Sequence, residues 1–193
     1  MGAGLPAAPA TYQIARAVNP AATAAYVDTD PVVLSHARAL LAVSDQVGAV
    51  AADLRAPPGL LSEPGLGAVI GPARPIGVIL GAVLHFLDPD AARRVTRGYR
   101  TADSPGQLPD HLGGLLDDEA LAKRLAAEYT AGTFVNHDLA GIHSFLAGLE
   151  PVGPGLAEAG TWRARMPAPV PRRREGHVLA GVARRESCRW SLT

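Results

Sequence analysis

The chain has 193 residues, enough for one domain with a substantial hydrophobic core. Lysine plus arginine equals aspartate plus glutamate at 18 each, and no apolar run reaches the length of a membrane span, so we expect a protein that binds neither nucleic acid nor membrane. The single cysteine, Cys188, excludes an internal disulfide or a cysteine-rich metal site and fits the reducing cytoplasm, where we expect the protein to work.

A Gly-x-Gly turn opens the chain at Gly2 and Gly4, and a short apolar strand, 24–27, ends in Asp28. The separation, about 20 residues, suits the single helix and return strand of a dinucleotide-type βαβ unit. We predict that helix over residues 10–18. Its apolar residues are expected to face inward: Tyr12, Ile14, Ala15 and Val18.

Asp30 followed by Pro31 is a helix start signal, because aspartate is a good N-cap and proline suits the first helical position. This helix is predicted to run to residue 43. A second strand, 47–52, follows and leads into Asp53. The proline- and glycine-containing stretch 57–65 indicates a loop with a helical turn inside it.

The strongest strand signal is IGVILGAVLHF at 76–86. This run is almost continuously apolar, as expected for a strand that helices cover on both faces. Val83, Leu84 and His85 are expected to end this strand at the same sheet edge as Asp28. The next helix is predicted from Asp88 to residue 100.

The pattern weakens over 104–114, where SPGQLPDHLGG shows neither strand alternation nor helical period. We expect a poorly formed strand or an irregular crossing there. The remaining elements are expected in this order: helix 116–129, loop 130–138, helix 139–149, a strand pair 149–156 and 177–184, and a disordered tail over 185–193. Alternating strands and helices with a closing hairpin predict an α/β three-layer sandwich.

Several consecutive motifs resemble one family in the same order. They are YVDTDPVVLSHARALL from residue 26, VAADLRAP from residue 50, VILGAVLHFLDPDA from residue 78, EYTAGTFVNHD from residue 128 and GLEPVGPGL from residue 148. These motifs are similar to an actinobacterial family of S-adenosylmethionine-dependent methyltransferases once known only as a domain of unknown function. The resemblance covers about residues 2–184. It implies a single class I methyltransferase domain over 1–184, with a Rossmann-like, mostly parallel sheet whose C-terminal strand is antiparallel.

Two departures accompany the resemblance. The family has a first strand that runs into an Asp-x-Gly-x-Gly-like turn, whereas this chain begins inside that turn, so we expect the first, central strand to be missing. Either the start site was placed too late or the chain is a truncated copy. A free sheet edge at that position would favour self-association. The second departure is the weak stretch 107–114, where the family places its fifth strand.

For the ribose, the resemblance points to Asp28, because a carboxylate at the carboxyl end of a strand can accept hydrogen bonds from both hydroxyls. Gly2 and Gly4 would let the backbone approach the cofactor closely. Asp30 either caps the following helix or shares the ribose.

For the adenine, the resemblance places Asp53 near the amino group, with Ala52 and Leu54 beside the ring. Val83, Leu84 and His85 would face the methionine part and the acceptor. His85 would orient the acceptor or take its proton, or would be a hydrogen-bonded lining histidine without a catalytic role.

Residues around the glycine-containing loop, Tyr129, Asn136 and His137, form an acceptor pocket or lid in one interpretation and an ordinary surface loop in the other. The six histidines show no metal-ligand pattern, so no metal is predicted.

The function that follows from the resemblance is S-adenosylmethionine-dependent transfer of a methyl group to a small-molecule acceptor. Methyl transfer is an in-line displacement that depends on alignment more than on a single catalytic side chain. Two alternatives remain open. One is a non-catalytic remnant that binds a nucleoside cofactor, and the other is an NAD-linked oxidoreductase, although Ala7 stands where its fingerprint requires a third glycine.

Overall fold

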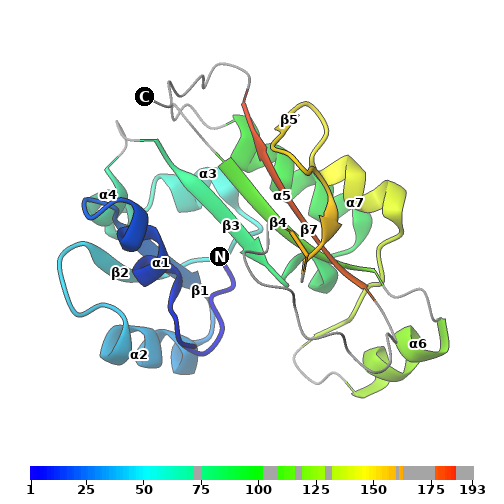
Figure 1. Ribbon diagram of the computed structural model, residues 1–193. Coiled ribbons are helices and arrows are strands. Elements are labelled where there is room, and N and C mark those ends of the chain that lie inside the picture. Colours follow the sequence, from blue (N-terminus) through cyan, green and yellow to red (C-terminus); the bar gives the residue numbers. More distant parts are fainter. Residues whose placement is uncertain are drawn as a thin grey trace.

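The computed structural model describes residues 1–71, 75–101, 108–115, 119–128, 132–159, 161–162 and 177–185. Helices and strands alternate through most of these ranges (Figure 1). In chain order the elements are α1 (Thr11–Val18), β1 (Ala24–Asp28), α2 (Pro31–Leu40), β2 (Val47–Ala51), α3 (Pro57–Leu61), α4 (Pro64–Ile70), β3 (Gly77–Gly81), the 3-10 turn η1 (Leu84–Phe86), α5 (Pro89–Thr101), β4 (Leu108–Leu115), α6 (Glu119–Glu128), α7 (Leu139–Phe145), β5 (Glu150–Pro151), β6 (Ala157–Glu158) and β7 (His177–Arg184).

Strands β1 and β2 form a parallel pair that helices cover on both faces. The pair runs in register from Ala24 opposite Val47 to Asp28 opposite Ala51. Alternate residues of the two strands belong to different clusters: Tyr26, Val47 and Ala49 pack with Ala37 of α2, whereas Val27 and Val50 pack in the main core with Leu66 of α4. The predicted helix–sheet–helix layering is therefore present here.

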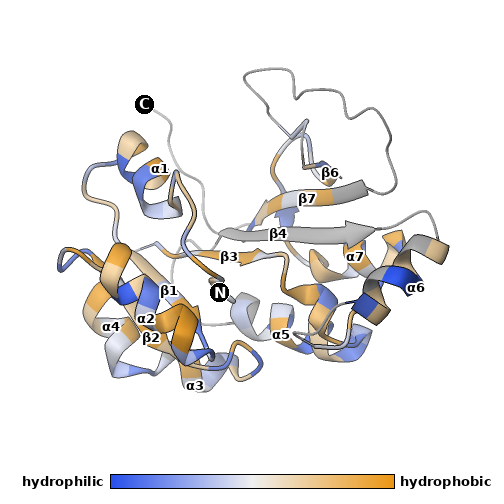
Figure 2. Ribbon diagram, turned by 90° about the horizontal axis from the view of Figure 1, so that it is seen from below, coloured by the Kyte–Doolittle hydropathy of each residue, from blue (hydrophilic) through white to orange (hydrophobic). Residues whose placement is uncertain are grey.

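The second sheet has the order β3–β4–β7–β5, with β6 also paired to β7. β3 is parallel to β4, and β7 is antiparallel to β4, which confirms the predicted antiparallel C-terminal strand. Figure 2 shows α5 and α7 on the same side of this sheet. Val78 and Leu80 of β3 pack there with residues of α5 and α7, so the main core is continuous across both sheets.

The first residues of the chain lie between the two sheets (Figure 1). The Met1 nitrogen donates a hydrogen bond to the carbonyl of Ile79 in β3 at 2.6 Å, and the Ala3 nitrogen donates to the carbonyl of Val27 in β1 at 3.1 Å. Among the described strands, β1 and β3 share no ladder of their own. These two bonds therefore link the carboxyl-terminal part of β1 to the middle of β3 through residues 1–3. The missing first strand stays a prediction.

The apolar run 76–86 is not one strand, which corrects the sequence prediction. β3 ends at Gly81, Ala82 has a φ of 52°, and the chain then turns into η1. Coverage on both faces was also wrong, because Val78 and Leu80 are buried while Gly77 and Ile79 are exposed. The continuous hydrophobicity reflects burial of Leu84 in a turn as much as burial of a strand.

Three further elements differ from prediction. Residues 108–115 form a strand paired on both sides, where a weak strand or irregular crossing was expected. Residues 57–65, predicted as a loop with a helical turn inside it, contain α3 and the start of α4, and Pro57 and Pro64 occupy first-turn positions, where a proline does not interrupt a helix. The predicted inward face of α1 is only partly correct: Tyr12 packs against the cluster around Ala37 and Ala15 is partly buried, but Ile14 and Val18 are exposed.

The C-terminal part matches prediction in outline. β7 has the predicted bounds, but the predicted strand 149–156 is reduced to β5, which pairs Glu150 with Arg184. Gly155, with a φ of 81°, lies between β5 and β6 and interrupts any longer strand. α7 ends at Phe145 instead of 149. Residues 104–107, 116–118, 129–131 and 186–193, on which parts of the predictions fall, lie outside the described residues.

Candidate cofactor site

The Asp28 carboxylate is fixed by backbone N–H groups at the end of β1. Oδ1 accepts hydrogen bonds from Thr29 N at 2.8 Å and Asp30 N at 3.0 Å, and Oδ2 accepts one from Gly4 N at 3.1 Å. A carboxylate has about four acceptor positions. Among the described residues three donors use them, so Oδ2 retains room for one ligand hydroxyl, whereas the sequence prediction gave this carboxylate both ribose hydroxyls.

Gly2 and Gly4 both have a φ of 61°, in the region that favours glycine. The glycines differ in their surroundings. A β-carbon on Gly2 would lie 2.5 Å from Val83 Cγ1 and 3.8 Å from Leu54 Cδ2, whereas a β-carbon on Gly4 would meet nothing within 4 Å. The structure thus brings together Gly2, Leu54 and Val83, three residues that the sequence placed in one site.

Asp30 caps α2. Its side chain accepts a hydrogen bond from Val32 N at 2.7 Å, and the residue precedes Pro31 at the first helical position. This is the helix-capping alternative of the sequence interpretation. A share in ribose binding stays a prediction.

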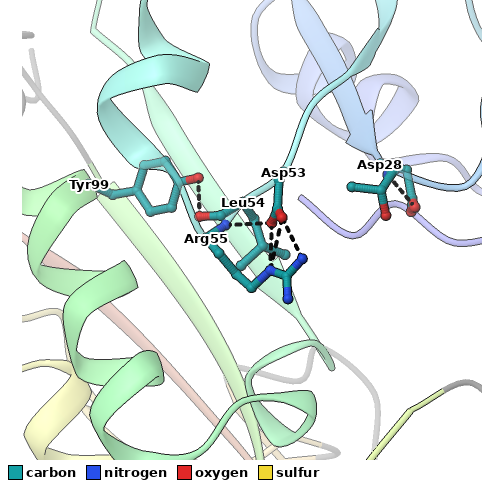
Figure 3. Close-up of polar contacts among 6 residues, drawn as sticks. Asp28, Asp53, Leu54, Arg55 and Tyr99 are labelled. Carbon is teal, nitrogen blue, oxygen red and sulfur yellow. Dashed lines mark hydrogen bonds and ion pairs between the residues drawn. The ribbon is translucent and has the colours of Figure 1, made fainter.

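Asp53 lies two residues beyond β2 and is held by Arg55 (Figure 3). Its Oδ1 accepts a hydrogen bond from Arg55 N at 2.8 Å, and the guanidinium reaches Oδ2 through Nη2 at 2.6 Å and through Nε at 2.9 Å. These hydrogen bonds lower the pKa of Asp53, so its carboxylate stays ionised at neutral pH. Both side chains are partly exposed, so the pair contributes little to stability.

The carbonyl of Leu54 accepts a hydrogen bond from the hydroxyl of Tyr99 at 2.8 Å (Figure 3). Tyr99 belongs to α5 and is 1% exposed. Burial and the neighbouring Asp53 raise the pKa of Tyr99, so its hydroxyl remains a donor. Sequence reasoning missed both Tyr99 and Arg55. The available signal for Tyr99 was its spacing from Ala92 and Val95, which places all three on the buried face of α5.

Val83, Leu84 and His85 sit in and just before η1 instead of at a strand end. Leu84 is fully buried and its side chain packs in the core, so its predicted contact with a cofactor is replaced by a packing role. His85 is half-buried, with ring centroids 4.3 Å from Phe86 and 5.1 Å from Phe134. Burial, and secondly His137, lower the pKa of His85.

The segment 132–138 is tied to η1. Val135 N donates a hydrogen bond to the His85 carbonyl at 2.7 Å, and His137 Nε2 donates to the Leu84 carbonyl at 2.9 Å. His137 is 3% exposed, which makes it a buried support of η1 instead of the expected lid or surface residue. Asn136 is exposed, and Tyr129 lies outside the described residues.

Within the described ranges, no cluster of histidine, cysteine, aspartate and glutamate side chains could hold a metal ion. No helix in the part of the chain that the structure describes is long and apolar enough to cross a membrane.

A family model described as S-adenosyl methyltransferase matches residues 1–186. The chain belongs to this family. Its cofactor is therefore S-adenosylmethionine, and the enzyme is an S-adenosylmethionine-dependent methyltransferase, as the sequence resemblance predicted. The NAD-linked alternative has no support in this match.

Solved structures agree with this family. A candidate methyltransferase from Thermobifida fusca YX is 32% identical, with a TM-score of 0.83, and the match covers 95% of this chain and 71% of that chain. A DUF574 family protein from Streptomyces avermitilis MA-4680 is 29% identical, with a TM-score of 0.85, and the match covers 95% of this chain and 73% of that chain. These likenesses confirm the Rossmann-like methyltransferase fold.

An O-methyltransferase family protein from Burkholderia thailandensis shares the fold at 19% identity and a TM-score of 0.60, over 89% of this chain and 46% of that chain. No curated protein sequence matches the chain.

The residues of this methyltransferase fit the cofactor. Asp28 keeps an acceptor position for a ribose hydroxyl, and Asp53 presents an ionised carboxylate near the backbone of Leu54. Gly2 supplies a stretch of backbone without a side chain, packed against Val83 and Leu54. A nucleoside with hydroxyl and amino donors matches this set of acceptors.

Proposed function

We propose that this methyltransferase binds S-adenosylmethionine along the carboxyl ends of β1 and β2 and transfers its methyl group to a small-molecule acceptor beside η1. The observation that supports this best is the convergence of three separate segments. Gly4 is bonded to Asp28, and Gly2 lies against both Leu54 and Val83. The carboxyl edge of a parallel sheet is the usual place for a ligand in open α/β folds.

In this proposal each segment has its own task. Asp28 accepts a ribose hydroxyl, and Asp53 with Leu54 receives the adenine. Gly2 and Val83 border the methionine part, and His85 faces the acceptor. His85 has a lowered pKa, so it is neutral at pH 7 and able to accept a proton from an acceptor hydroxyl or ammonium group.

The cofactor supplies an electrophilic methyl group on a sulfonium sulfur. The chain's own part is to bind, to align the acceptor with that methyl group and to exclude water. Alignment of this kind can lower a barrier by about 7–11 kcal/mol in well-oriented model reactions. A small acceptor, and a cytoplasmic location, stay predictions for this chain.

Calorimetric titration tests the proposal. We expect the purified chain to bind S-adenosylmethionine and S-adenosylhomocysteine but not NAD. Asp28→Ala should weaken both interactions at least about tenfold, because it removes a charged hydrogen-bond acceptor. Asp45→Ala, which removes an exposed aspartate in the α2–β2 connection, is the matched control and should leave affinity unchanged. Equal affinities of Asp28→Ala and the parent chain would contradict the assigned site.

A turnover assay separates an active enzyme from a binding remnant. The chain is incubated with S-adenosylmethionine and a panel of small phenols, amines and carboxylic acids, and S-adenosylhomocysteine is quantified. Production that depends on one acceptor class supports the transferase. Binding without production on any member supports the non-catalytic alternative.

A further inference from the structure

We propose that Tyr99 and Arg55 are positioning residues that fix the turn 53–55 and thereby set the selectivity of the site for adenine. This inference rests on the proposed function, because it assumes that Asp53 and Leu54 meet the base. Neither residue needs to touch the cofactor for this role.

Tyr99 holds the turn from the core side. The ring is packed in the main core and is 1% exposed, so the position of its hydroxyl is determined by the fold. That hydroxyl donates to the Leu54 carbonyl at 2.8 Å across 45 positions of sequence. The bond links α5 directly to the residue between Asp53 and Arg55.

Arg55 holds the same turn from the exposed side. Its backbone N–H and its guanidinium both bind the Asp53 carboxylate, so one residue fixes the rotation of that side chain. These contacts place two hydrogen bonds on each carboxylate oxygen, and Arg55 Nε is shared between Oδ1 at 3.0 Å and Oδ2 at 2.9 Å. In the proposed complex the amino group of adenine replaces one of the two shared Nε bonds, so Arg55 dictates the orientation in which the carboxylate accepts it.

The two contacts converge on one short segment (Figure 3). Leu54 also contributes its side chain, which lies close to Gly2. A shift of the Leu54 carbonyl would therefore move the acceptor at Asp53 and the apolar surface at Leu54 together. The apolar surface at Leu54 would receive the ring, and the acceptor at Asp53 would distinguish adenine from a base with a carbonyl at the same ring position.

The ratio of the affinities for S-adenosylhomocysteine and S-inosylhomocysteine distinguishes a positioning role from simple support of the fold. S-inosylhomocysteine differs from S-adenosylhomocysteine by an oxygen in place of the amino group, so its carbonyl would face the Asp53 carboxylate unfavourably. General destabilisation weakens both ligands in proportion. Misplacement of the turn weakens the adenine ligand more.

The experiment measures the affinities of both ligands for Tyr99→Phe and Arg55→Met. We expect the parent chain to prefer S-adenosylhomocysteine and each variant to lose about two- to tenfold of that preference, the range expected for one misplaced hydrogen bond.

Matched controls exist for both variants. Tyr26→Phe removes a hydroxyl that accepts a hydrogen bond from Tyr12 N at 3.1 Å, and Arg93→Met removes an exposed ion pair with Asp90. Both controls should keep the parent preference.

The inference would be overturned if both variants kept the parent preference, whether the two affinities stayed the same or fell in proportion. Arg55 is largely exposed, so we expect Arg55→Met to fold and to test the inference even if Tyr99→Phe does not fold. Failure of the parent chain to bind either ligand would instead refute the proposed function.

Discussion

Gly2 and Val83 approach so closely that a β-carbon on Gly2 would lie 2.5 Å from Val83 Cγ1. No real side chain fits at that distance unless Val83 moves. Val83 is itself buried, next to the fully buried Leu84. The turn at Gly2 therefore packs directly against Val83, the residue just before η1.

We predict that the same substitution at Gly2 and at Gly4 has different effects on S-adenosylhomocysteine affinity. Gly2→Ala and Gly4→Ala both place alanine at a φ of 61°, which costs about 1–2 kcal/mol in either case. Only Gly2→Ala adds a clash with Val83, so it should reduce S-adenosylhomocysteine affinity more than Gly4→Ala does. Calorimetry on the two variants checks this, and equal losses would show that the contact with Val83 is unimportant.

Two helical glycines predict opposite effects on stability. A β-carbon on Gly98 in α5 would lie 2.6 Å from Cγ of Pro57, a rigid ring, whereas one on Gly67 in α4 would meet nothing within 4 Å. Gly98→Ala should lower the free energy of unfolding by about 1 kcal/mol, since overpacking costs about 1–3 kcal/mol and better helix propensity returns about 1 kcal/mol. Gly67→Ala should raise it by about 0.5–1 kcal/mol. Urea unfolding of both variants tests the prediction, and the same sign for both would refute it.

We predict that replacing His137 destabilises the fold, although this residue lies outside the helices and strands. His137→Phe removes the donor to the buried Leu84 carbonyl and should cost about 1–3 kcal/mol. His143→Phe, at an exposed position of α7, is the control and should change stability by less than about 0.5 kcal/mol. Thermal unfolding compares the two, and equal midpoints would mean that the bond to Leu84 is not needed.

The lowered pKa of His85 predicts a pH dependence of folding. The unfolded chain binds a proton with a pKa of about 6.5, and the folded chain binds it only at lower pH. Stability is therefore complete above the unfolded pKa and falls as the pH drops through the window below it. We expect His85→Gln to reduce the slope of unfolding free energy against pH below about pH 6.5. Identical slopes in urea titrations of the variant and the parent chain would exclude His85 as the source.

The sequence predicted the features that depend on local pattern. The strand before Asp28, the cap at Asp30 and the antiparallel strand 177–184 are all found as expected. The missed features depend on partners distant in sequence. The apolar run after Gly81 was extended as a strand because hydrophobicity alone cannot separate a strand from a buried turn.

The site shows the same division. Asp28 and Gly4 were placed together because family motifs and strand ends specify them. Tyr99 was missed because its partner, Leu54, is 45 positions away, and no local pattern indicates that bond. His137 was expected near the surface, and only the folding of 132–138 onto η1 makes it a buried residue.

The position of β7 has a consequence for synthesis on the ribosome. β1 and β2 are close in sequence and can pair early, but β4 lies between β3 and β7, and β7 is translated long after β4. Until residues 177–184 emerge, one edge of β4 has no native partner. Because an unpaired strand edge can pair with other chains, we expect the nascent chain to be prone to aggregation during this interval.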